Sequence, residues 1–515
     1  MGENRGRRSR SARARRRSGG GAPGGFPWRQ LRNPYRCIEI LSEDQVEAIH
    51  EASLTVLEEQ GIRILFDEAR RLLRAAGAEV DESNLRVRFD RGLVLEAVGK
   101  APAKVMLQAR NPARNIEVGG DCVAFLTVGG PPNASDLDRG RRAGNLADFK
   151  DFIRLAQHFN AIHILNQPVE AVDVEVRTRH LETGLALLTL SDKVPFVFSR
   201  GARPVADVLE MVRIARGVGP EQFAREPSLY TVINTNSPLQ IDIPMARGII
   251  DMARAGQLMV LTPFTLAGAM APITLAGALV QQNAEALAGI ALSQIARPGA
   301  PVAYGGFTSN VDMKSGAPAF GTPEYTKAAL AGGQLARRYN LPYRSSNVTA
   351  SNVADAQAAY ESQMALWGAL MGGTHLLMHG AGWLEGGLTA SFEKFIMDVE
   401  MLQMMAAFFE EIEVTPETLA LDAVREVGPG GHFFGAAHTM ARYETAFYAP
   451  LLSDWRNFET WEESGALDAT IRANRICKQI LADFEPPPLE DALREELEAF
   501  VARRKAEGGA DLDGL

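Results

Sequence analysis

Short apolar segments and longer amphipathic stretches alternate along most of this chain. From about residue 122 onward, an apolar or β-branched run recurs every 30–45 residues or so, and a stretch with helical periodicity follows each run. The runs are 123–128, 162–165, 195–198, 230–233, 258–261, 301–304, 343–346 and 376–378. The helical stretches are 146–159, 175–190, 204–216, 244–257, 274–296, 323–339, 355–371 and 391–410. Eight strands that are each followed by a helix predict an α/β fold of the (β/α)8 TIM-barrel type.

Residues 37–121 have a different pattern, which predicts a cap of helices and one hairpin ahead of the barrel. Ser42 and Gln45 have the spacing of a capping box, so an amphipathic helix is expected to begin there and to end at Gly61. The other elements expected in the cap are helices over 68–75 and 92–98 and hairpin strands over 104–109 and 115–118.

The rest of the chain divides into a basic tail, the barrel and a C-terminal extension. Residues 1–36 hold eleven Arg and one Glu, so a net charge of −9 for the whole chain leaves roughly −19 on the remainder. Arg, Ser and Gly dominate the tail, which predicts disorder and at most an electrostatic contact with an acidic partner. The acidic body argues against nucleic-acid binding outside the tail. We assign 122–412 to the barrel and 413–515 to a helical C-terminal extension.

The cysteine count and the hydropathy exclude several classes of protein. Cys37, Cys122 and Cys477 are too few and too scattered for a disulfide framework, and neither CxxC nor HExxH occurs. We therefore expect a reducing, cytoplasmic location and no protein-bound zinc. No apolar run reaches 18 residues, so no membrane span is expected. Acidic barrels of this size often associate, which leaves a homo-oligomer open.

The chemistry of a (β/α)8 barrel lies at the carboxyl ends of its strands, and here those segments contain few ionisable groups. Arg200, His379 and Glu385 are nearly all of them. Such a site suits a reaction that needs little proton transfer, or a cofactor that carries the reactivity itself. As a group, aromatic side chains in the same segments favour a quaternary ammonium ligand, although each one alone is better explained by core packing. They are Phe264, Tyr304, Phe307 and Trp383.

Each ionisable candidate also has a structural interpretation. His379 would contact a cofactor or move a proton, or it would be a hydrogen-bonded polar residue at a strand end. Glu385 would face a substrate cation, or it would stabilise a helix N-terminus. Arg200 would bind a substrate carboxylate, or it would pair with an acidic loop residue.

Several stretches carry motifs that are specific to one family. They are TPF at 262–264, APITLAG at 271–277, QQNAE at 281–285, RPGAP at 297–301, DAQA at 355–358, HGAGWLEGGLT at 379–389 and RNFETWE at 456–462. On these motifs the chain resembles, over residues 37–485, the corrinoid-dependent trimethylamine methyltransferase superfamily. It is most similar to members that lack pyrrolysine, such as glycine betaine methyltransferases. The resemblance implies a (β/α)8 barrel that moves a methyl group from a methylated amine to Co(I) of a corrinoid (cobalamin) on a cognate partner protein.

The resemblance also implies roles for individual residues. It places His379 at the corrinoid as a catalytic residue, and we assign Glu385 as a second catalytic residue. The substrate-binding residues are expected to be Phe264, Tyr304, Phe307, Trp383 and Arg200. The residues expected to contact the corrinoid are Asn234, Asn236, Gly305, Gly306, Ser346, Asn347 and Gly380.

Three positions depart from the family pattern. Gly380 stands where relatives commonly have Asp, and Trp383 stands where they have Tyr. The position of pyrrolysine in the trimethylamine enzymes aligns with about Val353, an ordinary side chain. Relatives without pyrrolysine act on quaternary amines, which turns the expectation away from trimethylamine.

The chemistry agrees with that expectation. Attack on a methyl group of a quaternary amine expels a neutral tertiary amine, so no general acid is needed. The protein has only to orient the N–CH3 bond and to desolvate the cation. We therefore predict a methyltransferase that demethylates a betaine-type quaternary amine. The alternatives are a demethylase of another methylated amine, such as trimethylamine, and a barrel that binds quaternary amines without turnover.

Overall fold

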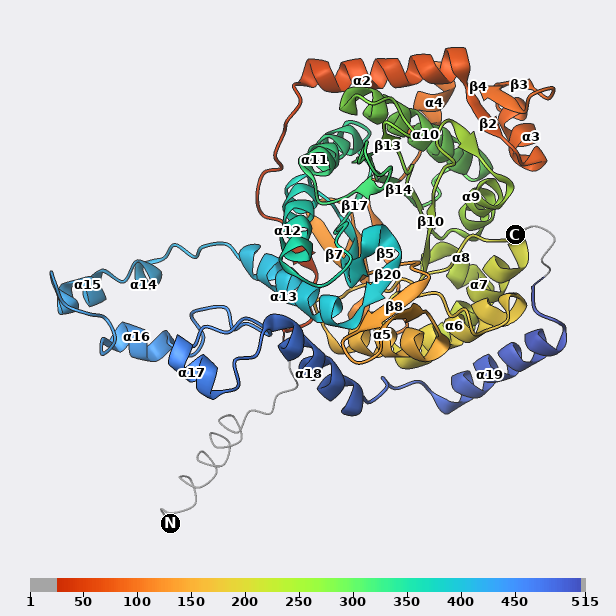
Figure 1. The fold of residues 1–515 in the computed structure, drawn as a ribbon. Coiled ribbons are helices and arrows are strands. Elements are labelled where there is room, and N and C mark those ends of the chain that lie inside the picture. Colours follow the sequence, from red (N-terminus) through yellow and green to blue (C-terminus); the bar gives the residue numbers. More distant parts are fainter. Residues whose placement is uncertain (1–25, 511–515) are drawn as a thin grey trace.

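The computed structural model describes residues 26–510 and shows a mixed α/β fold, in which helices surround a curled sheet (Figure 1). The main sheet has the order β1-β7-β18-β17-β14-β12-β10, and all neighbours from β7 to β10 are parallel. Its strands are β1 (Leu31–Arg32), β7 (Cys122–Thr127), β10 (Tyr230–Ile233), β12 (Leu258–Leu261), β14 (Val302–Gly305), β17 (Tyr343–Ser346) and β18 (Leu376–Ala381). Six of the eight strands expected from the sequence therefore form.

The other two expected strands, 162–165 and 195–198, appear only as single parallel bridges. Ile164 forms parallel bridges with Leu126 and with Val194, and Phe196 forms one with Tyr230. Single-residue bridges therefore connect β7 to β10 across this stretch. Proline explains part of the difference, because Pro168 and Pro195 carry no backbone N–H to donate to a ladder.

The helices expected after the strands form and cover the outside of the sheet (Figure 1). They are α5 (Leu146–His158), α6 (Val176–Leu190), α7 (Ala202–Arg216), α9 (Ile243–Ala255), α10 (Leu275–Ala296), α11 (Pro323–Arg338), α12 (Ala356–Met371) and α13 (Phe392–Phe408), and a short helix that was not expected, α8 (Pro220–Arg225), follows α7. Most begin at a side chain that accepts a backbone N–H of the first turn. These capping residues are Asn145, Asp242, Thr274, Thr322, Asp355 and Ser391. The caps fix where each loop ends and therefore how far it reaches over the sheet.

The N-terminal region contains the predicted elements and one sheet that the sequence did not indicate. The capping box at Ser42 and Gln45 is present, and the helix ends at Gly61 with a positive φ of 67°. The helices are α2 (Glu43–Thr55), η1 (Val56–Gln60), α3 (Asp67–Ala75), α4 (Arg91–Val98) and the short η2 (Pro112–Arg114). The predicted hairpin pairs β5 (Val105–Leu107) with β6 (Ile116–Val118). The additional sheet joins β11 (Gln240–Ile241), β2 (Ile62–Ile64), β4 (Arg86–Arg88) and β3 (Glu79–Asp81), which are too short to give a periodic pattern.

Part of the expected disordered tail is ordered. Leu31, in β1, is buried and pairs antiparallel with Val123 of β7. The expectation for 1–36 is therefore wrong for 26–36, because an apolar residue adds this segment to the edge of the sheet. The arginine-rich part of the tail, 1–25, lies outside the described residues.

Loops beyond the strand ends form two small sheets that the sequence analysis did not predict. One has the order β19-β20-β8-β9, and the other has the order β13-β15-β16. Their elements are β8 (Asn133–Asp136), β9 (Gly140–Ala143), β13 (Leu266–Ala267), β15 (Ser309–Val311), β16 (Pro318–Ala319), β19 (Trp383–Leu384), η3 (Glu385–Gly387) and β20 (Thr389–Ser391). Pairing between these loops holds segments distant in sequence over the same end of the main sheet.

The C-terminal region consists of helices, and only part of it packs on the rest of the molecule. The helices are α14 (Pro416–Leu419), α15 (Leu421–Val427), α16 (Ala437–Arg442), α17 (Phe458–Glu463), α18 (Ala469–Ala482) and α19 (Asp491–Ala506). Helix α18 packs against α13 and α5, and α19 packs against α6 and α7. The segment with α14–α17, residues 411–467, extends sideways from the ring of helices (Figure 1). We call this segment the arm.

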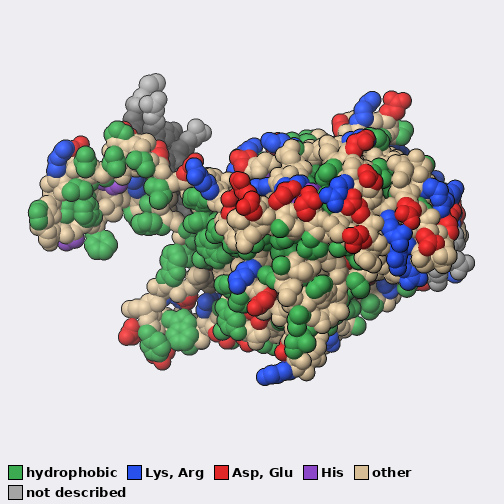
Figure 2. Space-filling view, turned by 90° about the horizontal axis from the view of Figure 1, so that it is seen from above, with side chains coloured by type: hydrophobic (Ala, Val, Ile, Leu, Met, Phe, Trp, Pro, Cys, Tyr) green, Lys and Arg blue, Asp and Glu red, His purple; other side chains and the backbone are tan. Residues whose placement is uncertain are grey.

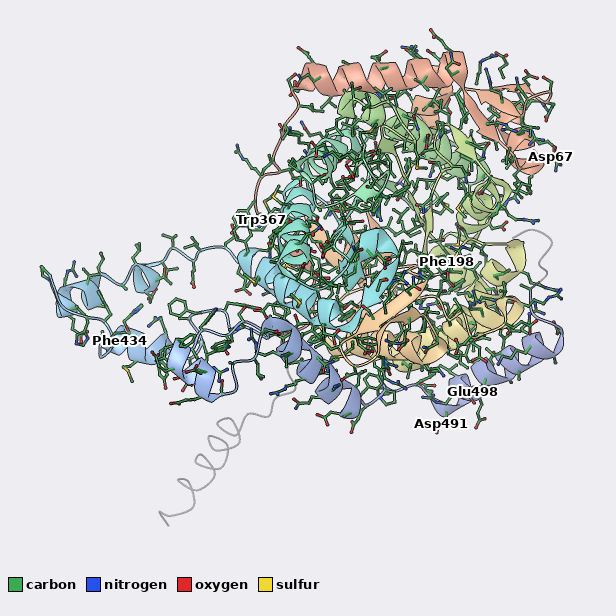
Figure 3. The ribbon with its side chains drawn as sticks, viewed as in Figure 1. Asp67, Phe198, Trp367, Phe434, Asp491 and Glu498 are labelled. Atoms are coloured by element: carbon green, nitrogen blue, oxygen red, sulfur yellow. The ribbon has the colours of Figure 1, made fainter. Side chains whose placement is uncertain are left out.

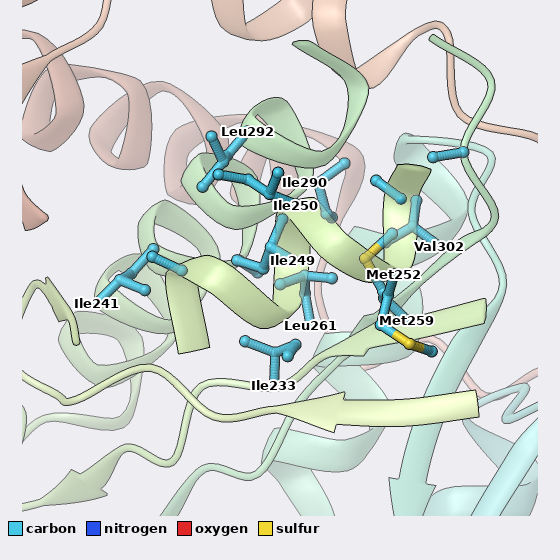
Figure 4. Packing of buried hydrophobic residues seen from close by; sticks show 14 of the residues in the cluster. Ile233, Ile241, Ile249, Ile250, Met252, Met259, Leu261, Ile290, Leu292 and Val302 are labelled. Carbon is cyan, nitrogen blue, oxygen red and sulfur yellow. The ribbon is translucent and has the colours of Figure 1, made fainter. Parts of the chain in front are cut away.

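The main core lies between the sheet and its helices. Figure 4 shows side chains of β10 and β12, including Ile233 and Leu261, packed against Ile249 of α9 and Ile290 of α10. All four side chains are fully buried. No helix within 26–510 has the length and hydrophobicity needed to cross a bilayer.

Candidate functional site

A cavity of about 320 Å3 lies at the carboxyl ends of the parallel strands. Residues from nearly every strand end contribute to it, and Phe198 points into this central region (Figure 3). Its lining residues are Gly129, Asn166, Phe196, Phe198, Ser199, Arg200, Val232, Asn234, Met245, Thr262, Phe264, Phe307, Arg344, Met378, His379 and Trp383. The lining contains no carboxylate and only two arginines, so the site is apolar and cationic.

Arg344 of β17 is the most unusual of these residues. Its side chain is buried, and no carboxylate within the described part of the chain forms an ion pair with it. One Nη donates to His379 Nε2 at 3.1 Å and the other to the Gly306 carbonyl at 3.4 Å, whereas the buried Nε has no partner. Burial lowers the pKa of Arg344 to about 10, so the guanidinium remains charged at neutral pH. A buried cation with an unused donor is chemically suited to hold an anion.

His379 lies near the carboxyl end of β18, where the register shifts between Leu377 and Ala381, and complements this cation. Because guanidinium groups only donate, His379 Nε2 accepts from Arg344, and the ring proton is on Nδ1. Nδ1 is buried and has no partner in the protein. Burial, and then the charge of Arg344, lowers the pKa of His379 well below its ordinary value, so the ring is neutral. With a φ of 54°, the backbone presents this donor from a left-handed conformation that is rare outside glycine.

Aromatic rings form the other wall of the cavity. The Trp383 ring lies 4.2 Å from His379, and Phe307 lies 5.2 Å from Phe264, measured between ring centroids. Trp383 Nε1 donates to the Thr349 carbonyl at 3.1 Å, which fixes the orientation of the indole. The rings thus supply π-faces near the buried guanidinium, an environment that suits an alkylammonium group.

The structure brings six of the expected site residues together at this cavity. They are Arg200, Asn234, Phe264, Phe307, His379 and Trp383. The other expected residues do not line it. They are Tyr304, Asn236, Glu385, Gly305, Gly306, Ser346, Asn347 and Gly380.

Three of those residues have partners elsewhere. Tyr304 is buried behind β14 and donates its hydroxyl to Asn283 at 3.1 Å. Asn236 bonds Asp242 at the start of α9. Glu385 accepts from Arg141 Nε at 2.8 Å and from Thr389 at 2.5 Å, and the hydrogen bonds from Arg141 hold the pKa of that carboxyl below its ordinary value.

Behind the cavity, a buried ion pair holds the ends of two strands. Asp398 pairs with Lys394, and both side chains are fully buried. Asp398 also accepts from Gly382 N at 2.8 Å and from Asn347 Nδ2 at 3.2 Å. Asn347 donates in addition to the Gly380 carbonyl at 3.0 Å. The pair therefore fixes the segment that carries His379 and Trp383.

Two positions that depart from the family pattern, Gly380 and Val353, can be interpreted from their surroundings in the structure. A Cβ at Gly380 would lie 2.6 Å from the Leu126 carbonyl oxygen, so this backbone does not accommodate the expected Asp. Val353 is 58% exposed and does not line the cavity.

Sequence analysis missed Arg344, and it expected Arg200 to bind a carboxylate. Arg200 is largely exposed and pairs with Glu170 at 3.2 Å, so its charge is already compensated. Arg344 lies within a strand, whereas we examined only residues after the strands. The available signal was an arginine inside the run 343–346, which the fold buries completely.

Three buried histidines predict a loss of stability in mild acid. Burial lowers the pKa of His163 to about 3, and it lowers the pKa values of His375 and His379 as well. The unfolded chain takes up protons below about pH 6.5, whereas the folded chain does not. Unfolding free energy should fall by about 1 kcal/mol per pH unit for His163 as the pH drops from 6.5 to 5, and the lowered pKa values of His375 and His379 add losses of the same sign. Denaturant titrations at several pH values test this, with His163→Gln reducing the slope; constant stability over this range would contradict it.

Comparison with known proteins identifies the class. Residues 4–509 match the family model described as trimethylamine methyltransferase (MTTB), and the chain belongs to this family of methyltransferases. It is 36% identical to a glycine betaine methyltransferase of Desulfitobacterium hafniense strain Y51, over 92% of this chain and 98% of that protein. It is 32% identical to a trimethylamine methyltransferase, MttB, of D. hafniense strain DCB-2, over 91% and 94%.

Among solved structures, the chain is similar to the monomethylamine methyltransferase MtmB of Methanosarcina barkeri. The TM-score is 0.44 at 10% sequence identity, over 86% of this chain and 93% of that one.

Proposed function

We propose that this protein transfers a methyl group from a carboxylate-bearing quaternary amine, of the glycine betaine type, to Co(I) of a corrinoid on a separate protein. One observation carries the proposal: the buried guanidinium of Arg344 has no acidic partner among the described residues and faces a cavity walled by aromatic rings. The glycine betaine methyltransferase with 36% identity supports the same substrate class.

The two charged ends of such a substrate match the two walls of the cavity. Its carboxylate would accept from Arg344 Nε and His379 Nδ1, two buried donors of the cavity lining that have no hydrogen-bond partner in the protein. Its trimethylammonium group would lie against the rings of Phe264 and Trp383. Binding would then compensate the buried charge, which supplies both affinity and discrimination.

The cavity is large enough for only one of the two reactants. A volume of about 320 Å3 accommodates a small amine but not a corrin macrocycle. The corrinoid, which supplies a strongly nucleophilic metal and accepts the methyl group, would therefore meet the substrate at the cavity mouth. Asn234 lines the cavity immediately after β10, and we propose it as a contact there.

The proposed reaction needs no proton transfer by the protein. The reduced corrinoid would supply the electron pair for the new bond to the methyl carbon, and the electrons of the broken N–CH3 bond would remain on nitrogen. The product amine is neutral, so the absence of a carboxylic acid from the lining fits the chemistry. His379, neutral and hydrogen-bonded to Arg344, would act by orienting the carboxylate and would not act as an acid.

We also propose a closed barrel, a division into domains and a cellular location for this protein. We propose that the curled sheet closes as a (β/α)8 barrel, supported by the parallel bridges of Ile164 and Phe196. We retain the domain limits 37–121, 122–412 and 413–515 as a proposal. Three free cysteines support a reducing, cytoplasmic location.

Methyl transfer to reduced cobalamin tests the proposed function. We would mix the protein with Co(I) cobalamin, or with a cognate corrinoid protein, and add glycine betaine, proline betaine, carnitine, choline or trimethylamine. Conversion of the Co(I) spectrum to that of methylcobalamin is expected with a carboxylate-bearing quaternary amine. Conversion only with trimethylamine would favour the alternative substrate. Binding of betaine without conversion would favour a non-catalytic binder.

Trp383→Leu should weaken binding of the substrate cation by about 3- to 30-fold, because cation–π contacts contribute about 0.5–2 kcal/mol. The neutral isostere 3,3-dimethylbutanoate separates this contribution from packing, since it has the same shape without the charge. Calorimetric titration should show a larger loss for glycine betaine than for the isostere. Equal losses would indicate that Trp383 only fills space.

A further inference from the structure

We propose that two copies of this chain associate by exchanging arms, each arm (residues 411–467) packing on the outer face of α12 and α13 of the other copy. The inference is independent of the proposed function. It rests on two apolar surfaces of the same chain, neither of which is covered in the described structure.

The arm has almost no core of its own. Its helices α14–α17 contain four to seven residues each, and Ala423 is the one residue in them that is buried. Helices this short are unstable in water without a packing partner. Large apolar side chains project from the arm instead, among them Phe434 and Phe447, at 85% and 86% exposure. Figure 2 shows apolar side chains at the surface of the projecting part of the molecule.

The arm is nevertheless held at both ends and near its middle. It begins after α13, ends at α18, and is fixed where the Leu451 and Leu452 amides donate to Glu400 of α13 at 2.7 and 3.1 Å. A segment anchored in this way presents its apolar side chains in a defined direction, away from its own barrel (Figure 1).

The second surface, which we call the α12/α13 patch, lies at the base of the arm. Tyr360, Met364 and Trp367 share one face of α12, and Met404 and Phe408 share one face of α13. All five are at least 40% exposed, and the Trp367 and Phe408 rings are 5.1 Å apart. Figure 3 shows Trp367 on the outer side of the ring of helices, the side from which the arm carrying Phe434 extends.

The position of the α12/α13 patch favours a second copy over the corrinoid protein. Helices of this fold run antiparallel to the strands, so the ends of α12 and α13 near Trp367 and Phe408 lie opposite the cavity. A protein that delivers cobalt has to cover the cavity mouth, at the other end. The arm contains more acidic residues than arginines, whereas the five side chains of the patch are uncharged. The patch therefore does not repel the arm electrostatically.

The apolar area is sufficient for a stable dimer. The arm exposes six large aromatic side chains, at roughly 150–250 Å2 for each one fully buried. At their observed exposures they supply about 600–1,000 Å2, comparable to the roughly 800 Å2 per partner in a standard interface. Because both surfaces lie on each chain, one two-fold axis allows both arms to be covered at once.

Sedimentation of the full chain over a concentration series tests the proposal. We expect a mass of about twice 55.9 kDa for the unsubstituted protein. The arm variant Phe434→Asp/Phe447→Asp and the patch variant Trp367→Asp should each give the single-chain mass. Ile273→Asp, which changes an equally exposed apolar residue outside both surfaces, should leave the dimer intact.

Hydrogen exchange of the unsubstituted chain provides evidence that does not depend on variants folding. Amides of α14–α17 should be protected at concentrations where the dimer forms and should lose protection on dilution. A monomer at every concentration would overturn the proposal. The proposal would also be overturned by an oligomer that persists in both variants. Protection of the arm that appears only when a corrinoid protein is present would overturn it as well.

Discussion

Replacing Arg344 with methionine is expected to lower kcat/KM for glycine betaine by about 30- to 1,000-fold, since losing one partner of a buried charge pair costs about 2–4 kcal/mol. The guanidinium is buried without a carboxylate partner, so a substrate carboxylate would be its counter-ion. The loss should be largely in KM, because the carboxylate is bound throughout the reaction. Initial rates of Co(I) methylation over a range of substrate concentrations measure this effect.

Two controls separate substrate binding from structure. Arg200→Met should lower kcat/KM less than about fivefold, because an exposed ion pair such as Arg200 with Glu170 contributes about 1 kcal/mol or less. For choline, which has no carboxylate, Arg344→Met should cause no loss. Equal losses with choline and glycine betaine would mean that Arg344 supports the cavity and does not bind the substrate.

Replacing Lys394 with methionine is expected to destabilise the fold by about 3–5 kcal/mol, the usual cost of leaving a buried charge without its partner. Asp398 would be left in a fully buried position, where desolvation already raises the pKa of its carboxyl. Because Asp398 also holds Gly382 and Asn347, cavity geometry should loosen as well. Denaturant-induced unfolding, followed by circular dichroism, measures the change.

The matched control removes both charges. Lys394→Met/Asp398→Leu should recover part of the lost stability, because it leaves no uncompensated ion in the core but removes the acceptor of the Gly382 amide and of Asn347. Arg425→Met, which breaks the exposed pair of Arg425 and Asp422, should leave stability unchanged. If Lys394→Met were as stable as the unsubstituted chain, the ion pair would not hold the strand ends.

Much of the framework could be predicted from sequence because it depends on local patterns. The capping box at Ser42 predicted the start of α2, and apolar runs predicted six parallel strands. The small sheets at the strand ends could not be predicted in this way. Trp383–Leu384 pairs with Thr389–Ser391, strands of two and three residues with no periodicity of their own. Their pairing depends on tertiary contacts.

The cavity was predicted in part, and the errors have a common cause. The position of His379 at a strand end could be read from the pattern, and so could the aromatic residues nearby. Whether a side chain points into the cavity depends on the tilt of each strand, which sequence periodicity does not define. Tyr304 therefore joined the core, and Arg344, inside its strand, went unnoticed.

Competition between two substrates in one reaction tests the central claim most directly. Glycine betaine and choline would be supplied at equal concentrations with the protein and Co(I) cobalamin, and mass spectrometry would quantify dimethylglycine and dimethylethanolamine. This account predicts that dimethylglycine exceeds dimethylethanolamine by at least about 30-fold, the ratio set by an anchored carboxylate. Equal amounts of the two amines would contradict a carboxylate site at Arg344, and the absence of both would contradict methyl transfer from quaternary amines of either kind.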